Sequence, residues 1–123
     1  MDNRHTFLSG TEGPDIAFTS QLSGCTFSIG FPSPDGGRIV SHIQPPQSRQ
    51  PTAADYQSMR DAASLGEMDH FFDRESHPGA TSYGDPHNRA TIIGIRRQGN
   101  WFFYAQIYNI VDRRLYRVER LNS

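Results

Sequence analysis

Two residues of this chain have the types and spacing needed for thiol chemistry. Cys25 is the only cysteine among 123 residues, and His42 follows it seventeen positions later. A single cysteine cannot form an internal disulfide, so it serves packing, metal binding or chemistry. Gly24 precedes the thiol, and a residue without a side chain lets a substrate approach the backbone. The pair therefore indicates a thiolate nucleophile with an imidazole base. The alternative is a buried cysteine that only packs.

A predicted β-hairpin places this cysteine and histidine. Residues 25–31 alternate between apolar and small or polar side chains, which is typical of a strand. Residues 32–37 combine proline and glycine and predict a turn, and residues 38–44 predict the returning strand. If paired residue numbers sum to about 67, Cys25 faces His42 with Cβ atoms about 5 Å apart.

One principal helix is predicted after the hairpin. Thr52 is a good N-cap and Asp55 stands in a capping-box position, so a helix is expected from Ala53 to about Leu65. It places Tyr56, Met59 and Ala63 on one face, and Met68, Phe71 and Phe72 are expected to continue that packing. Residues 1–14 are predicted to be a loose lead-in, residues 16–18 a strand or short buried helix, and residues 73–88 a long loop.

The C-terminal third predicts an antiparallel meander. Residues 90–96, 101–110 and 114–121 are strand-like and are separated by short turns. The middle strand is apolar on both faces, so we expect it in the centre of a sheet that is covered on both sides. The predicted fold is α+β: residues 1–123 form one domain with a mainly antiparallel, sandwich-like sheet and one principal helix.

Composition excludes several functional classes. The formal charge of −1 argues against a general nucleic-acid binder, and no apolar run is long enough to span a membrane. The N-terminus lacks the apolar core of a signal peptide, which excludes only export by that route. The histidines show no HxxxH or CxxC-type spacing, so we predict no metal site and no cofactor.

The residues around the cysteine resemble a family of bacterial toxins. Leu22-Ser23-Gly24-Cys25 is similar to the LSGC motif of the deamidase toxins that include cytotoxic necrotizing factor and Burkholderia lethal factor. The likeness to the lethal factor extends to Phe18-Thr19, Gly36-Gly37, His42-Ile43, Ser82-Tyr83-Gly84 and Ile92-Ile93-Gly94-Ile95. The cysteine-to-histidine spacing also resembles that of the CheD family of chemoreceptor deamidases. The likeness spans about residues 16 to 110, and its specific part runs from Thr19 to His42.

This resemblance implies an activity and a role for each site residue. Cys25 would attack the carboxamide carbon of a substrate glutamine, His42 would transfer the proton, and Thr19 would orient His42. The Cys25 amide would form an oxyanion hole beside Gly24 and Ser23, with Gln21 as a further candidate. Apart from the resemblance, the position of Tyr83, His77, His87 and Asp85 in the long loop predicts that they line a substrate groove. The longer loop between Cys25 and His42 contains Pro32 and Pro34 and bears on which substrate is recognised.

The resemblance also implies a biological setting. The expected partner is a protein that carries the target glutamine, with no nucleic acid or membrane, and the chain is expected to be a monomer. A virulence effector would be secreted or delivered by a bacterium and would act in the cytoplasm of the target cell. All twelve basic residues are arginine, which is consistent with avoiding ubiquitination in a foreign cell or with GC-rich codon bias.

Other functions remain open from sequence alone. The same thioester chemistry would allow transfer to an amine or cleavage of peptides. A non-catalytic β-rich binding module with a buried Cys25 is the main alternative, and an endogenous chemoreceptor-type glutamine deamidase is another. Thiol reactivity distinguishes the binding module from an enzyme, because an activated thiolate alkylates quickly at mildly acidic pH whereas a buried structural thiol does not.

Overall fold

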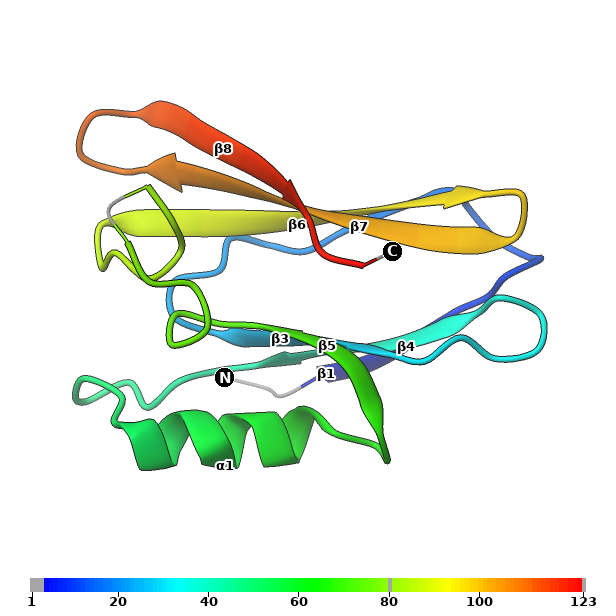
Figure 1. The fold of residues 1–123 in the computed structure, drawn as a ribbon, viewed down its shortest axis with the longest axis horizontal. Coiled ribbons are helices and arrows are strands. Elements are labelled where there is room, and N and C mark those ends of the chain that lie inside the picture. The colour runs from blue at the N-terminus through cyan, green and yellow to red at the C-terminus, as the bar shows by residue number, and fades with distance from the viewer. Residues whose placement is uncertain (1–3, 80, 123) are drawn as a thin grey trace.

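The predicted hairpin forms the middle of the first of two antiparallel sheets in a computed structural model that describes residues 4–79 and 81–122 (Figure 1). Across this sheet the strands are β1 (Arg4–Leu8), β4 (Arg38–Ile43), β3 (Thr26–Gly30) and β5 (Met68–Phe72). The turn between β3 and β4 contains Pro34 and Asp35, and the Asp35 carboxylate accepts the amide of Gly37 at 2.9 Å. Both predicted strands of the hairpin are therefore confirmed.

Two strands of this sheet were not predicted from the sequence. β1 lies inside the segment predicted to be a loose lead-in, where it pairs with the outer edge of β4; residues 1–3 of that segment lie outside the described residues. β5 is formed by residues predicted only to continue the packing of the helical face; Phe71 does pack against the cluster that contains Met59 and Ala63, but the strand itself was not predicted. The helix is capped at Ser64, and the chain then reverses near Gly66, whose φ is 96°. Phe71 and Phe72 then point to opposite faces of a strand.

The second sheet contains the predicted C-terminal meander and one short N-terminal strand. In order across the sheet its strands are β2 (Ile16–Phe18), β6 (Asn88–Arg97), β7 (Asn100–Asn109) and β8 (Arg114–Arg120). The two alternatives for residues 16–18 are therefore resolved as a strand. Gln98 and Gly99 have φ values of 51° and 77°, which is the two-residue turn that matches the twist of adjacent strands.

The single helix, α1 (Ala53–Ala63), begins where the capping residues predicted. The Thr52 side chain accepts the Asp55 amide, and the Asp55 carboxylate accepts the Thr52 amide. Met59 and Ala63 are buried against Ile43, and Tyr56 packs against the same cluster. The helical face predicted from the sequence is thus confirmed, and it covers the side of the first sheet that faces away from the second.

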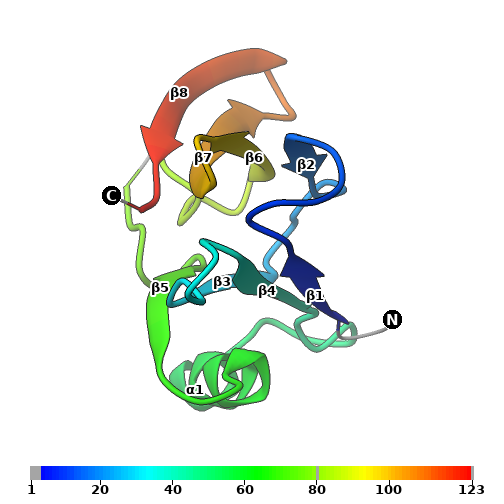
Figure 2. The same ribbon diagram turned by 90° about the vertical axis from the view of Figure 1, so that its right-hand side faces the viewer.

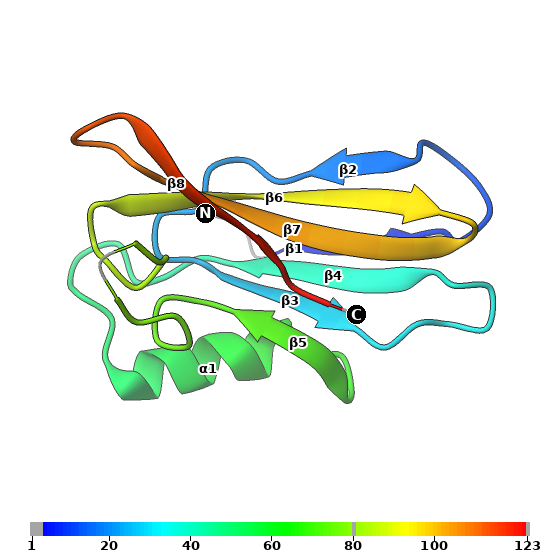
Figure 3. The same ribbon diagram turned by 45° about the horizontal axis from the view of Figure 1, so that its top comes forward.

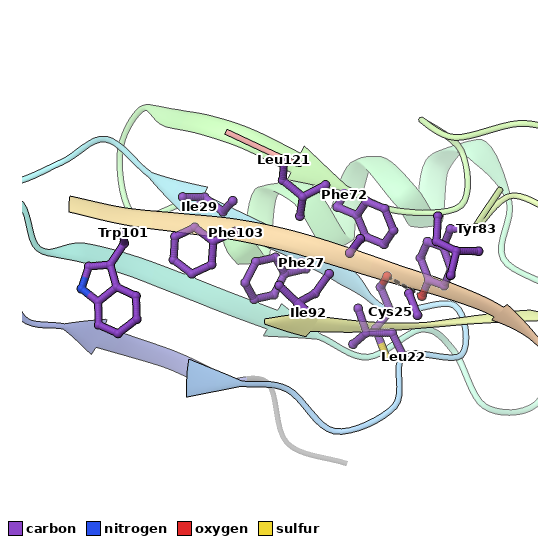
Figure 4. Close-up of a cluster of buried hydrophobic side chains, with 13 residues drawn as sticks. Leu22, Cys25, Phe27, Ile29, Phe72, Tyr83, Ile92, Trp101, Phe103 and Leu121 are labelled. Atoms are coloured by element: carbon purple, nitrogen blue, oxygen red, sulfur yellow. Dashed lines mark hydrogen bonds between the residues drawn. The ribbon is translucent and has the colours of Figure 1, made fainter. Parts of the chain in front are cut away.

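The molecule is layered as second sheet, first sheet and helix (Figures 2 and 3). The main core lies between the two sheets, where Phe27 of β3 meets Phe103 of β7 with ring centroids 6.1 Å apart (Figure 4). α1 contacts β3 and β4. β7 does lie in the middle of its sheet, as predicted. The prediction that this sheet is covered on both sides is wrong for the described residues, because their only helix packs on the other sheet.

None of the helices in the described part of the chain is both long enough and apolar enough to cross a membrane.

Candidate functional site

Cys25 lies in a tight turn at the entrance to β3. Leu22 forms a bridge with Ala90 of β6, and Gly24 then adopts a φ of 113°, a value that favours glycine. The next residue, Cys25, is only 2% exposed and belongs to the core between the sheets. The turn thus fixes the backbone on both sides of the thiol and places the sulfur inside the protein.

Tyr83 holds this turn from the long loop. Its hydroxyl accepts the Gly24 amide at 2.7 Å and donates to the Cys25 carbonyl at 3.0 Å (Figure 4). The ring stacks on Phe72 at 4.8 Å, and the guanidinium of Arg74 lies 5.3 Å from its centroid. Tyr83 is fully buried, so its position corrects the prediction of a groove-lining side chain. It acts instead on the backbone that carries Cys25.

Removing the Tyr83 hydroxyl is expected to destabilise the protein. In Tyr83→Phe the ring can still stack, but a buried amide and a buried carbonyl lose their partner. We expect a loss of about 1–3 kcal/mol in the free energy of unfolding, measured by urea denaturation. The control is Tyr116→Phe, whose hydroxyl bonds Asp112 at the surface and whose loss should have little effect. Equal stability of Tyr83→Phe and wild type would show that the two hydrogen bonds of the Tyr83 hydroxyl do not stabilise the protein.

The β3–β4 register differs from the predicted one by two residues. Phe27 pairs with His42 and Thr26 with Ile43, so Cys25 stands opposite Gln44 rather than His42. The reason is that the turn centres on Pro34 and Asp35, one position later than the prediction assumed. A shift of two residues preserves the face to which a side chain points. Cys25 and His42 therefore still share the face that looks toward the second sheet, as diagonal neighbours whose Cα atoms are about 7–8 Å apart.

Gln44 is the group in direct contact with the thiol. The Cys25 Sγ donates to Gln44 Oε1 at 3.3 Å. Burial raises the pKa of Cys25, and this outweighs the backbone hydrogen bonds of Ser23 and Cys25 and the positive charge of Arg74, which all lower it. The resting sulfur is therefore a protonated thiol that is held by a carboxamide.

His42 presents a neutral imidazole to the space between the sheets. Burial lowers its pKa, and the nearby charge of Arg4 lowers it further. Its Nε2 is buried and has no hydrogen-bond partner among the described residues. An unpaired basic nitrogen on the same sheet face as a thiol has the chemistry of a general base. No hydrogen bond joins it to Cys25 in the described structure.

A cavity of about 600 Å³ opens between the two sheets beside these residues. His42 and Gln44 contribute to its wall from the first sheet, and Thr19 and Ser20 contribute from the segment after β2. Cys25 is not part of the wall. Gln44 lines this cavity and also accepts the hydrogen bond of the Cys25 thiol. It is therefore the residue that connects the cavity with the sulfur.

Thr19 is held at the cavity wall by the neighbouring strand. Its amide donates to the Ile92 carbonyl at 2.9 Å, and its hydroxyl accepts the Ile92 amide at 3.0 Å. These two bonds fix Thr19 opposite the first sheet. The hydroxyl retains its proton for donation. The structure thus brings Thr19 and His42 to one cavity, although no hydrogen bond between them is present.

The remaining predicted site residues lie away from this cavity. Gln21 and Ser23 are exposed and Gly24 is buried in the turn, with its amide taken by Tyr83. His77 contacts Glu119 of β8, with 3.3 Å between Nε2 and the carboxylate. In the loop, His87 lies 3.4 Å from Asp85 and its side chain is 67% exposed. None of these residues lines the cavity, so the prediction of a groove formed by the long loop is not supported there.

Gln44 was missed by the sequence analysis, and a signal for it existed. It stands at the first position after β4, and the correct hairpin register places it directly opposite Cys25. A turn centred on Pro34 and Asp35 would have given that register. Arg74, whose positive charge lowers the pKa of Cys25, comes from the long loop, and no sequence pattern around it indicates that it lies near the thiol.

Among residues 4–79 and 81–122, no group of three or more His, Cys, Asp or Glu side chains could hold a metal ion. Comparison of the chain with protein-family models, with curated proteins and with solved structures finds no match.

Proposed function

We propose that the chain is a cysteine-dependent protein-glutamine deamidase, with Cys25 as nucleophile and His42 as base. One observation carries the proposal: a neutral imidazole with an unpaired Nε2 lies on the same sheet face as Cys25, and Thr19 lines the same cavity. Diagonal neighbours on one face remain within reach of a side chain as long as histidine. Thiol–imidazole bonds are often long in free enzymes and shorten when substrate binds.

The reaction follows from these positions. The carboxamide of a substrate glutamine enters the cavity and displaces that of Gln44 from the sulfur. His42 takes the thiol proton, and the thiolate attacks the carboxamide carbon. The Cys25 amide stabilises the oxyanion. His42 then protonates the departing ammonia, and water hydrolyses the thioester to leave glutamate and the free thiol.

Gln44 has a specific part in this scheme. Its carboxamide occupies the place beside the thiol that the substrate carboxamide would take. A side chain that accepts the thiol proton's hydrogen bond favours the neutral thiol, so it keeps the cysteine unreactive until a substrate replaces it. Gln44 would thus protect the sulfur in the resting protein.

Removing this side chain is expected to expose the thiol. We expect Gln44→Ala to react with iodoacetamide about tenfold faster than wild type at pH 7.5, because both access and thiolate fraction increase. The pH midpoint of alkylation should also fall, since burial is what raises the pKa of Cys25. The rate is measured by intact-protein mass spectrometry, and the label is unambiguous because Cys25 is the only cysteine.

A matched glutamine provides the control for that experiment. Gln47 is exposed, and its side chain donates to the Pro45 carbonyl at 3.0 Å. Gln47→Ala should alkylate at the wild-type rate. If Gln44→Ala also reacts at that rate, Gln44 does not cover the thiol.

The substrate and setting are part of the proposal. We propose a protein substrate in the cytoplasm of a target cell, reached by a secreted or delivered effector. The support is the resemblance of Leu22 to Cys25 to the deamidase toxins and the absence of lysine from the chain. A cavity of about 600 Å³ has room for a glutamine side chain and its immediate neighbours.

The direct test is mass spectrometry of target-cell lysates incubated with the protein. A specific glutamine that gains about one dalton identifies the substrate and supports deamidation. New peptide termini would indicate a protease instead. No protein-dependent change over eukaryotic and bacterial lysates would count against any enzyme.

One observation favours a second candidate, a non-catalytic binding module. Cys25 is 2% exposed and its thiol has a raised pKa, as expected of a cysteine that only packs. In that case the cavity would hold a ligand without chemistry. Slow alkylation in both wild type and Gln44→Ala, together with unchanged lysates, would support this candidate.

A further inference from the structure

The outward side of the second sheet has the composition of a protein-binding surface. We define the outer face as alternate residues of β6 from Arg89 to Arg97, their partners on β2 and β7, and Leu115, Val118 and Arg120 of β8. It is the side opposite the core and opposite Cys25. In Figure 2 this side of the sheet points away from β3, β4 and α1.

Large apolar side chains on this face are open to solvent at both edges. On β2, Ile16 is 57% exposed and Phe18 is 75% exposed. On β8, Leu115 is 59% exposed and Val118 is 54% exposed. The strands between them contribute further half-buried apolar and aromatic residues at Ile93, Ile95, Phe102, Tyr104 and Tyr108. Exposed and half-buried apolar side chains on all four strands of one face are unusual for a side of a protein that binds nothing.

The charges on the outer face all have one sign. Arg89, Arg97 and Arg120 are its only charged members, and none of its positions is aspartate or glutamate. The guanidinium of Arg120 lies 4.7 Å from the centroid of Phe102. Surfaces rich in aromatic residues and arginine, and poor in acidic residues, are typical of interface centres.

One end of the face also has a hollow that can receive an anchoring side chain. This hollow measures about 510 Å³ and lies between the ends of β7 and β8. Tyr108 and Leu115 line it together with Arg113 and Arg114. A pocket with apolar and basic walls fits an apolar side chain that is flanked by carboxylates.

We propose that the outer face docks a partner protein whose contact surface has an apolar centre flanked by carboxylates. Charge complementarity identifies this occupant: three arginines on a face that has no acidic member match acidic groups around an apolar patch. A second copy using the same face would bring arginine against arginine, which disfavours it. Single-stranded nucleic acid stacks on flat rings, whereas isoleucine, leucine and valine account for much of this face.

The test uses three synthetic amphipathic helices that share one leucine and tryptophan stripe. Their flanking positions carry glutamate, glutamine or lysine. We expect the glutamate peptide to bind wild type at least about tenfold more tightly than the lysine peptide at low salt, with the difference reduced at high salt. Affinity is measured by fluorescence anisotropy. A Leu115→Ser/Val118→Ser double variant should lose binding of the glutamate peptide.

Two further variants separate the outer face from other exposed apolar residues. Phe31→Ser removes a side chain that is 51% exposed but lies outside the outer face, and it should bind like wild type. Arg120→Glu should weaken binding of the glutamate peptide and strengthen binding of the lysine peptide. Circular dichroism verifies that each variant is folded.

Four results would overturn the proposal. These are equal affinity for the three peptides, binding that survives the double variant, tighter binding of oligo-dT than of the glutamate peptide, and self-association that the double variant abolishes. None of them depends on deamidation, because the outer face and Cys25 lie on opposite sides of the second sheet.

Discussion

Cys25→Ser is expected to abolish deamidation while leaving the protein folded. Serine is close in size to cysteine, so the buried turn and its bonds to Tyr83 can be kept. The pKa of a hydroxyl is far too high for His42 to generate an alkoxide in place of the thiolate. We therefore expect the deamidation rate to fall by about a thousandfold or more. The measurement is the appearance of glutamate at the target glutamine, followed by mass spectrometry under equal enzyme and substrate concentrations.

A histidine series completes this experiment. His42→Ala should reduce the rate by about a hundredfold to ten-thousandfold, because it removes the base and the proton donor. His87→Asn is the matched control, since its side chain is 67% exposed and does not line the cavity. It should retain the wild-type rate. Full activity of folded Cys25→Ser would reject the nucleophile, and loss confined to His42→Ala would indicate water activation by the imidazole instead.

Asp73→Ala is expected to cause a large loss of stability. The carboxylate is fully buried and accepts Arg60 of α1 through two bonds at 2.8 and 3.0 Å. It also accepts the amide and hydroxyl of Ser76 and the hydroxyl of Thr26. One side chain thus joins the helix, the long loop and β3. Breaking a buried pair of this kind costs about 3–5 kcal/mol, a large share of the stability of a small domain.

The control for Asp73→Ala shares the same arginine. Glu75 contacts Arg60 at 3.0 Å but is 39% exposed, so solvent screens the pair. Glu75→Ala should change the free energy of unfolding by no more than about 1 kcal/mol. The free energies of unfolding are measured by urea denaturation. Similar losses in Asp73→Ala and Glu75→Ala would show that burial does not make Asp73 more important for stability than Glu75.

The Asp73 contribution should also depend on pH. Burial acts to raise the pKa of Asp73, but the hydrogen bonds from Arg60 and Ser76 outweigh it and lower the pKa below the ordinary value. A lowered folded-state pKa gives stability that is complete above the unfolded value and is lost as pH falls through the folded one. The stability difference between wild type and Asp73→Ala should therefore be constant near neutrality and shrink below about pH 4.

Most secondary structure was predictable because its signals are local. The capping pair Thr52 and Asp55 marked the start of α1, alternation of apolar residues marked β3, and a long run of apolar and aromatic residues marked β7. β1 was not predictable, since its five residues are stabilised by pairing with β4 rather than by a pattern of their own. β5 was not predicted, because its adjacent phenylalanines fit a helix as well as a strand until the partner strand is known.

The candidate site was predictable in its residue types and face, but not in its contacts. Alternation alone placed Cys25 and His42 on one face, and that parity survived a register error of two residues. The partner of the thiol, Gln44, depended on the position of the turn centre. The role of Tyr83 could not be predicted, because it lies 58 positions from Cys25 in the sequence and only folding brings its hydroxyl to the Cys25 carbonyl.

The sequence by itself determined the helix, the strands with clear alternation and the residues able to do thiol chemistry, since local backbone preference and side-chain chemistry belong to each residue. Only the tertiary structure decided the division into two sheets, the burial of Cys25 and its contact with Gln44, and the open outer face. These features depend on which distant segments pack together, as Tyr83 and Arg74 do around the thiol. That choice balances burial of apolar surface against chain entropy over the whole molecule.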